Sequence, residues 1–288
     1  MNSKFSGVAR YAATIVLAAL AVVAGWQLWA HYELEPWTRD GRVRADIVAI
    51  APDVSGLVTE VLVHDNQVVH KGDVLFRIDR DRFLLALRQA EANVEGKAAT
   101  LDAAQKDLVR YKTMTSIAVS EQKIEQVTAT AAQAQADIHQ AEADRDLAKL
   151  NLERSEVQAA VNGPITNFDL QPGNYVTAGK GVAALIDQDS LHVDGYFEET
   201  KLPLIHIGDK AVIHMMGEDQ AILGHVESVA GGIEDRDRSS GSNLLADVNP
   251  TFSWVRLAQR IPVRIALDNV PPGVRLVAGR TSTVVINP

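Results

Sequence analysis

The sequence predicts a mixed α+β protein with an N-terminal transmembrane helix, a small split β domain, a helical hairpin and a C-terminal β-barrel. Three observations predict this order of parts. An uncharged apolar segment lies near the N-terminus, two similar β-like stretches flank a long run of Ala-rich heptads, and alternating strand patterns fill the C-terminal region. An architecture of this kind provides reach rather than catalytic chemistry.

The N-terminal segment has the length and composition of a membrane anchor. Residues 11–30 carry no charged side chain, and at about 1.5 Å per residue such a helix covers about 30 Å, the thickness of a bilayer's hydrocarbon core. Lys4 and Arg10 precede this segment. The positive-inside rule therefore leaves residues 1–10 in the cytoplasm and the bulk of the chain in an extracytoplasmic space.

Two tryptophans mark the far end of the apolar segment. Trp26 and Trp29 lie where amphipathic rings favour the membrane interface. The alternative is a cleaved signal peptide, for which the small residues around Ala19 and Ala21 would supply the cleavage site. An uncleaved anchor is favoured because the apolar character continues well past Ala21, beyond a usual signal-peptide core.

Residues 52–79 are echoed by residues 162–187 at a constant offset of 107 positions, within the two predicted halves of a small β domain, 42–79 and 162–189. The matching pairs include Gly56 and Gly163, Val58 and Ile165, Val69 and Val176, and Gly72 and Gly179. Turns of this β domain are predicted at Gly56, Asn66, Gly72, Gly163, Gly173 and Gly179, because tight turns need residues that tolerate positive φ. The repeat predicts that the two halves form one domain.

Residues 80–156, between the two halves, read as an antiparallel α-helical coiled-coil hairpin. They contain no proline and a single glycine. A seven-residue apolar period packs as a left-handed coiled coil, with alanine allowing close approach of the helices. The predicted seam residues are Leu87, Val94, Leu101, Leu108, Ile124, Ala131, Ile138 and Leu152. Each arm is expected to span roughly 30 to 35 residues, or about 50 Å.

The hairpin is expected to reverse between Met114 and Ser120. β-Branched and hydroxyl residues in this stretch weaken a helix, and Ser120 is placed to cap the next one.

The C-terminal region, residues 190–288, predicts a β-barrel or sandwich. Short strands with alternating apolar residues are expected at 191–197, 211–214, 224–229, 260–267 and 281–286. Residues 234–242 are charged and contain Gly and Ser, so they are expected to form a mobile loop.

Composition excludes several function classes. The net charge of −9 argues against nucleic-acid binding, and the absence of cysteine removes disulfides, thiol catalysis and Cys-based zinc sites. No hydrolase, phosphate-loop or dinucleotide motif is present, so we expect no catalytic, cofactor-binding or metal site. His206, His214 and His225 are interpreted as strand-surface residues, and Lys71 and Lys180 lack the sequence context of lipoyl or biotin attachment.

The ordered set of parts resembles the membrane fusion proteins, or periplasmic adaptors, of the HlyD and EmrA type. The strings that carry the resemblance are APDVSGLV at 51–58, NQVVHKGDVL at 66–75, PGNYV at 172–176, YFEETKL at 196–202 and WVRLAQRIPVRI at 254–265. The last string is most similar to the branch that includes the AaeA aromatic-acid efflux subunit. The resemblance implies that the split β domain is lipoyl-like. The absence of cysteine separates this chain from the lipid-anchored adaptors of the family.

The resemblance also implies a function without catalysis. Such adaptors are single-pass proteins of the bacterial inner membrane that assemble as trimers or hexamers. They link an inner-membrane transporter, here of the MFS or aromatic-acid-exporter type, to a TolC-like outer-membrane channel for export of small organic compounds such as aromatic carboxylates. Channel docking in the family is associated with Arg, Leu, Leu and Ser at the hairpin tip.

Arg110, Tyr111, Met114 and Ser120 occupy comparable places in this sequence. Compared with the family pattern, both leucines are replaced and the spacing to Ser120 is one residue shorter. The alternative is that these four residues only form the reversal between two helices. For the whole chain, the alternative is an anchored structural envelope protein whose coiled coil binds a partner without transport.

Overall fold

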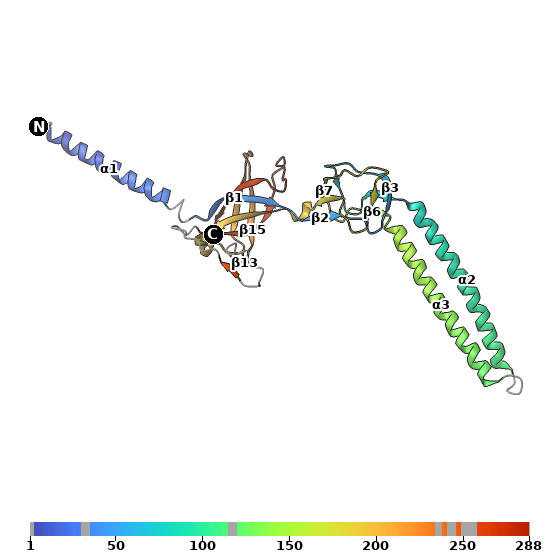
Figure 1. Ribbon diagram of the computed structural model, residues 1–288. Coiled ribbons are helices and arrows are strands. Elements are labelled where there is room, and N and C mark those ends of the chain that lie inside the picture. The colour runs from blue at the N-terminus through green and yellow to red at the C-terminus, as the bar shows by residue number, and fades with distance from the viewer. Residues whose placement is uncertain are drawn as a thin grey trace. The chain divides into compact units, whose positions relative to one another are not determined.

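A computed structural model describes residues 3–29, 35–114, 120–233, 238–240, 246–248 and 258–287 (Figure 1). The chain divides into two compact units. Residues 47–189 form one unit, and residues 1–46 together with 190–288 form the other.

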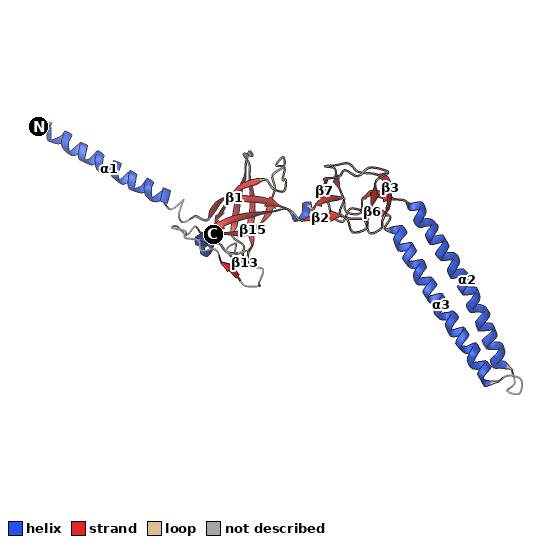
Figure 2. Ribbon diagram, in the orientation of Figure 1, coloured by secondary structure: helices blue, strands red, loops and turns tan. Residues whose placement is uncertain are grey.

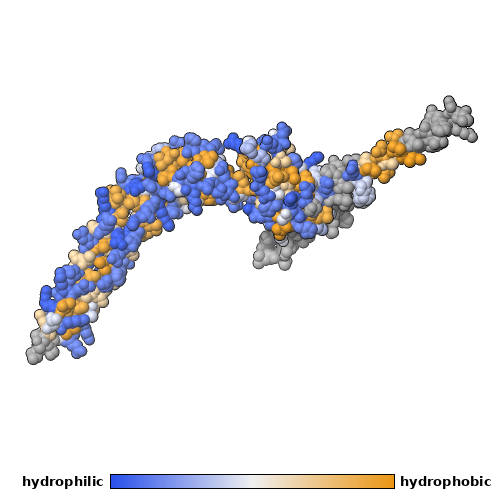
Figure 3. All heavy atoms as spheres, turned by 180° about the vertical axis from the view of Figure 1, so that it is seen from behind, coloured by the Kyte–Doolittle hydropathy of each residue, from blue (hydrophilic) through white to orange (hydrophobic). Residues whose placement is uncertain are grey.

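Helix α1 (Ser3–Trp29) contains residues 11–29 of the predicted apolar segment. Its described side chains are exposed and largely hydrophobic (Figure 3). They include Trp26 and Trp29, whose ring centroids lie 5.6 Å apart. Within the described part of the chain, no helix combines the length and the apolar character needed to cross a bilayer. The predicted membrane anchor at residues 11–30 therefore stays a prediction.

In the unit 47–189, two four-stranded sheets form a domain that we call the sandwich domain. The first sheet has the order β2 (Ile47–Ile50), β9 (Ala183–Ile186), β7 (Gly163–Thr166) and β4 (Val68–Val69). The second has the order β6 (Glu156–Gln158), β5 (Val74–Ile78), β3 (Gly56–Val61) and β8 (Tyr175–Val176). Each sheet thus takes two strands from each side of the hairpin, and the predicted joining of the halves is confirmed.

The pairing registers reproduce the sequence repeat. Val69 pairs with Gly163 and its counterpart Val176 pairs with Gly56, so both pairs follow the same offset. The same holds for the ladder that joins Ile165 to Leu185, because the equivalent ladder joins Val58 to Ile78. The two sheets are therefore related by internal pseudo-symmetry.

The turns of the sandwich domain follow the repeat as well. Asn66 and Gly173 are equivalent and both adopt positive φ, at 61° and 94°. Gly72 and Gly179 are likewise equivalent, at 94° and 77°. Asparagine is among the few residues with a side chain that enter this region readily, so Asn66 replaces glycine at little cost.

Gly56 and Gly163 are not turn residues, and their assignment to turns is wrong. They are the first residues of β3 and β7. A Cβ atom on Gly163 would lie 1.9 Å from the carbonyl oxygen of Ile186, and one on Gly56 would lie 2.6 Å from a methyl carbon of Ile78. Glycine is favoured at Gly163 because another backbone approaches closely, and at Gly56 because a buried side chain fills the space of a Cβ atom.

The core of the sandwich domain lies between the two sheets. Val58, Leu75, Phe76, Ile165 and Leu185 are completely buried there, and they come from both halves of the repeat. Side chains from both sheets therefore meet in one interior.

The second unit contains a closed six-stranded barrel. Its strands, in order around the barrel, are β1 (Trp37–Arg44), β10 (His192–Glu198), β15 (Arg260–Asn269), β12 (Ala221–Val229), β11 (Lys210–Met215) and β16 (Thr281–Asn287). The five strands predicted in the C-terminal region are confirmed. Closure removes every exposed sheet edge and encloses a core that includes Phe197, Ile213 and Ile265.

Short helices and one small sheet complete the described structure. Two 3₁₀ turns, η2 (Gln188–Ser190) and η3 (Glu199–Leu204), flank β10. Strands β13 (Arg238–Ser240) and β14 (Ala246–Val248) pair with each other. The loop predicted over 234–242 is therefore wrong at 238–240, and its other residues lie outside the described part of the chain.

Two boundaries of the sandwich domain differ from the sequence-based ones. The prediction started this domain at residue 42, whereas β1 closes the barrel by pairing with β10 and β16. The hairpin was expected to run to residue 156, whereas β6 (Glu156–Gln158) already pairs with β5. Neither β1 nor β6 shows a regular alternation of apolar and polar residues, so sequence periodicity does not reveal these strands.

Candidate functional site: the helical hairpin and its base

The hairpin consists of two antiparallel helices packed along their length (Figure 2). Helix α2 (Arg80–Thr113) has 34 residues and α3 (Glu121–Glu153) has 33, as the heptad pattern predicts. Asp79 caps α2 by accepting a hydrogen bond from the backbone N–H of Arg82. At about 1.5 Å per residue, each arm extends about 50 Å.

All eight predicted seam residues are at least half-buried. Leu87, Val94, Leu101 and Leu108 of α2 and Ile124, Ile138 and Leu152 of α3 are half-buried, and Ala131 is buried. By contrast, Leu85, Val109 and Leu147 are more than half exposed. The only fully buried residues of α3 are alanines, which lets the helices approach closely.

Polar pairs cross the seam at its edges. The Lys97 ammonium lies 3.0 Å from the Asp137 carboxylate, and the Gln133 amide donates a second hydrogen bond to that carboxylate. These two partners, with Gln133 the larger cause, lower the pKa of Asp137. Opposite charges at these positions favour one register of the two helices.

Arg145 occupies the position in the second heptad series where an apolar residue is expected. Its guanidinium contacts the Asp146 carboxylate at 2.8 Å. The carboxylates of Glu142 and Glu91 also attract its charge electrostatically. All three raise the pKa of Arg145, with Asp146 the largest cause. Because Glu91 belongs to α2, the arginine contributes a charge interaction between the arms.

The tip of the hairpin is formed by the end of α2 and the start of α3. Met114 is exposed, and Arg110 is exposed and paired with Asp107 at 3.0 Å. Ser120 caps α3 by accepting a hydrogen bond from the Lys123 N–H, as predicted. Residues 115–119 lie outside the described residues.

Tyr111 has a different position from the other tip residues. It is half-buried, and the Lys123 ammonium lies 5.7 Å from the centroid of its ring. This cation–π contact joins the two arms next to the reversal. Tyr111 therefore contributes to closing the hairpin, whereas Arg110, Met114 and Ser120 face solvent.

At its base, the hairpin continues directly from two paired strands. Ile78 ends β5 and α2 begins at Arg80, and α3 ends at Glu153 shortly before β6. Arg77 and Glu156 are register partners in the β5–β6 ladder. Both arms thus emerge from neighbouring strands of one sheet without a flexible linker.

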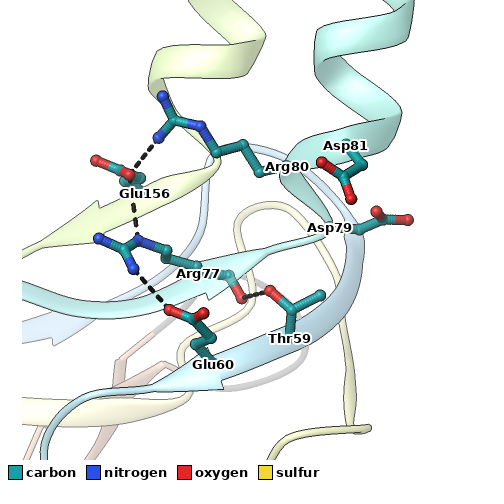
Figure 4. A pocket seen from close by; sticks show the side chains of 7 residues that line it. All are labelled: Thr59, Glu60, Arg77, Asp79, Arg80, Asp81 and Glu156. Carbon is teal, nitrogen blue, oxygen red and sulfur yellow. Dashed lines mark hydrogen bonds and ion pairs between the residues drawn. The ribbon is translucent and has the colours of Figure 1, made fainter.

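An ion-pair network surrounds this base, in an open pocket of about 460 Å³ (Figure 4). The Arg77 guanidinium contacts the Glu60 carboxylate at 2.6 Å and the Glu156 carboxylate at 3.2 Å. Arg80, the first residue of α2, contacts the same Glu156 carboxylate. The hydrogen bond from Arg77 to Glu60 is the largest cause of the raised pKa of Arg77.

The network connects four elements: β3, β5, β6 and the start of α2 (Figure 4). A second contact lies on the α3 side, where Arg154 lies 3.5 Å from Asp53. Each pair contributes little alone, but together they link the base of the hairpin to the sandwich domain at several points. Sequence reasoning missed this cluster. Arg77 interrupts the apolar run of β5, which is the signal that could have found it.

The structure does not bring the remaining candidate residues together. His206 contacts Asp209, His225 contacts Asp268 at 2.6 Å, and His214 lies on β11. Across the described residues, no group of three or more His, Asp or Glu side chains could hold a metal ion. Lys71 and Lys180 are both exposed and adjoin the Gly72 and Gly179 turns.

Comparison with known proteins identifies both β units. Residues 46–188 match the model described as "RND MFP, barrel-sandwich hybrid domain". Residues 190–287 match the one described as "AAEA-like beta-barrel domain". The protein YdhJ of Escherichia coli K12, described as uncharacterized, is 39% identical over 96% of this chain and 97% of its own length.

Solved structures share the fold. MacA from Actinobacillus actinomycetemcomitans matches with a TM-score of 0.65 and 18% identity, covering 88% of this chain and 78% of MacA. The membrane fusion protein Spr0693 from Streptococcus pneumoniae matches at 0.63 and 14%, covering 86% and 97%. The domain matches and the YdhJ relationship show that the chain belongs to the membrane fusion proteins, non-enzymatic periplasmic adaptors of efflux systems, with an AaeA-like β-barrel domain.

Proposed function

We propose that this adaptor connects an inner-membrane transporter of the MFS or aromatic-acid-exporter type to a TolC-like outer-membrane channel, and that its hairpin tip docks on the channel. The observation that carries the proposal is the hairpin itself. It is about 50 Å long, it is charged on its outer face, and its base is fixed by ion pairs to the sandwich domain. A long rigid arm of this kind is useful only when something distant must be contacted.

Residues 11–30 hold the chain in the inner membrane in this proposal, with residues 1–10 in the cytoplasm and the rest in the periplasm. The absence of charge from that segment and the preceding Lys4 and Arg10 support this orientation. The adaptor works as a trimer or hexamer around the transported compound. Small organic compounds, aromatic carboxylates among them, are the proposed cargo.

Crosslinking in cells tests the docking step. A photoreactive residue is placed at Met114 or at Ser120, and the trapped partner is identified. The matched control carries it at Ala99, which is exposed in the middle of α2 and away from the tip. We expect the tip positions to capture an outer-membrane channel and Ala99 not to capture it.

Two results would contradict the proposal. Capture of sibling copies or peptidoglycan-associated proteins alone would favour an anchored structural envelope protein. Equal capture of the channel from Ala99 and Met114 would show that the contact is not made by the tip. Orientation in the membrane is tested separately by labelling residues 1–10 from each side of the inner membrane.

A further inference from the structure

We propose that the barrel contacts the surface of the lipid bilayer through one apolar turn, residues 206–209, which we call the Ile207 turn. The Ile207 side chain is 73% exposed, and Leu204, at the end of η3, is also exposed. Two large apolar side chains therefore face solvent within four residues of chain. This lipid contact goes beyond the adaptor role, but it rests on the proposed membrane anchor at residues 11–30.

Hydrogen bonds hold the Ile207 turn in one conformation. The backbone N–H of Asp209 donates to the carbonyl of His206 at 3.2 Å, and the His206 N–H donates to the Asp209 carboxylate at 2.7 Å. Gly208 has a φ of 95°, as the third residue of a type II turn requires. The Gly208 N–H also donates to the carbonyl of Val226 on β12 at 2.8 Å. Ile207 is therefore presented at the tip of a fixed turn.

The sandwich domain contains the same turn with a different tip. Residues 70–73 read His-Lys-Gly-Asp, whereas residues 206–209 read His-Ile-Gly-Asp. The two hydrogen bonds recur in residues 70–73, at 2.9 and 2.7 Å, and Gly72 has a φ of 94°. The tip of that turn is Lys71, whose charge is suited to solvent. Because the backbone geometry accepts a polar tip, it does not explain why the barrel exposes an isoleucine there.

The Ile207 turn lies at the end of the barrel where β1 begins. Strand β11 starts at Lys210, which pairs with Asn287 at the end of β16. Trp37, the first residue of β1, pairs with Val285 of the same strand. The turn that precedes β11 and the start of β1 are therefore at the same end of the barrel.

The chain between α1 and this end of the barrel is short. Helix α1 ends at Trp29 and β1 begins at Trp37, so only residues 30–36 join them. At about 3.5 Å per residue, even a fully extended chain covers at most about 28 Å between these two residues. An anchor at residues 11–30 therefore keeps the Ile207 turn close to the bilayer.

The residues of the turn suit the boundary between headgroups and acyl chains. An apolar tip gains by entering this boundary, because its surface is removed from water. The exposed His206 and Lys210 lie on either side of Ile207 in the sequence, and their polar ends are suited to the headgroup layer.

Fluorescence quenching by lipid tests the contact. The full chain is purified and reconstituted alone into phosphatidylcholine–phosphatidylglycerol vesicles that contain lipids spin-labelled near the headgroup. Because the sequence has no cysteine, a single introduced cysteine can carry an environment-sensitive dye. The test variant is Ile207→Cys. Val22→Cys, within α1, reports separately on the anchor.

Met216→Cys is the matched control. Met216 is 76% exposed and is likewise the tip of a turn with a positive-φ glycine, Gly217 at 85°. It follows Met215, which pairs with Ser282 near the start of β16, so it lies at the opposite end of the barrel. We expect the dye at 207 to be quenched at least about twofold more strongly than the dye at 216, because only the former reaches the acyl-chain boundary.

The outcomes separate the lipid contact from the anchor. Quenching at 22 without stronger quenching at 207 than at 216 would overturn the contact, leave the anchor standing and favour a protein partner for the turn. No quenching at any of the three positions would contradict the anchor and the contact together. Quenching at 207 alone would support the contact and contradict the anchor.

Discussion

The hairpin and the sandwich domain belong to one continuous stretch of chain, yet they are stabilised in different ways. In the sandwich domain, Leu75, Phe76 and Ile78 are completely buried between two sheets. In the hairpin, no residue of α2 is buried, and α3 buries only alanines. Two sheets enclose an interior, whereas two helices leave their seam open to solvent on both sides.

Because of this difference, local features contribute a larger share of the stability in the hairpin than in the sandwich domain. A half-open seam contributes little hydrophobic free energy per residue, so the helices depend on caps, on helix propensity and on the ion pairs at their base. The difference also leaves apolar side chains such as Leu147 and Val109 exposed along the arms. The sandwich domain has a core of its own, and a hairpin variant is expected to leave it folded.

The largest expected effect on stability is in the sandwich core. Phe76→Ala should lower the free energy of unfolding by about 3–5 kcal/mol, because it removes a fully buried ring and leaves a cavity. Leu101→Ala, at the half-buried seam, should cost clearly less. Denaturant unfolding with hydrogen exchange on peptides from each region measures both. Equal losses would mean that the hairpin seam is as well enclosed as the core.

A helix-breaking change in the hairpin comes next. Leu101→Pro removes a backbone hydrogen bond in the middle of α2 and should cost about 3 kcal/mol or more. We expect reduced helical circular dichroism and lost export, while exchange protection of β5 and β7 persists. Leu101→Ala serves as the control because it keeps the helix. Full export by the proline variant would show that an intact hairpin is not needed.

Loss of the α3 cap should have a smaller effect. Ser120→Ala removes the acceptor for the Lys123 N–H and should destabilise the start of α3 by about 1 kcal/mol. Ser120→Asp restores an acceptor at the same place and should recover most of that stability. Hydrogen exchange of the first turn of α3 is the readout. Unchanged exchange in Ser120→Ala would show that the cap contributes nothing there.

A pH-dependent contribution is expected at Asp137. Its pKa is lowered in the folded hairpin by Gln133 and Lys97, so its contribution is present above the ordinary aspartate pKa and is lost as the pH falls through the lowered value. Asp137→Asn should therefore remove a small acid-dependent part of hairpin stability and change little at low pH. Helical circular dichroism during acid titration compares the two proteins, and identical titration curves would contradict this role.

The smallest expected effect on stability accompanies a large expected effect on function. Arg110→Glu changes an exposed side chain that forms an ion pair with the exposed Asp107, so folding and membrane association should be unaffected. Export should fall if the tip docks on the channel as proposed. Lys106→Glu, an exposed charge one turn earlier, is the control and should export normally. Unchanged export in Arg110→Glu would remove this residue from the docking surface.

Much of the fold could be predicted because the informative patterns are local or strictly periodic. The heptads located both arms, Ser120 was recognisable as a cap, and the offset between Gly72 and Gly179 marked equivalent turns. Strand β1 was missed because Arg, Asp and Gly interrupt its alternation, and pairing with β10 and β16 defines it instead. Gly56 and Gly163 were correctly singled out, but close packing rather than a turn explains them.

In the candidate site, too, some features follow from the sequence and others only from the tertiary structure. The sequence by itself determined the seam and the ends of the hairpin helices, because apolar period and capping act over one or two turns of chain. Only the tertiary structure decided that each sheet combines two strands from each half, that Arg77 meets Glu156 across 79 residues, and that Trp37 shares a pocket with Lys201 and Arg260. Such contacts join residues that are far apart in the sequence. They depend on how the hairpin and the barrel strands bring those residues together, which no local sequence pattern specifies.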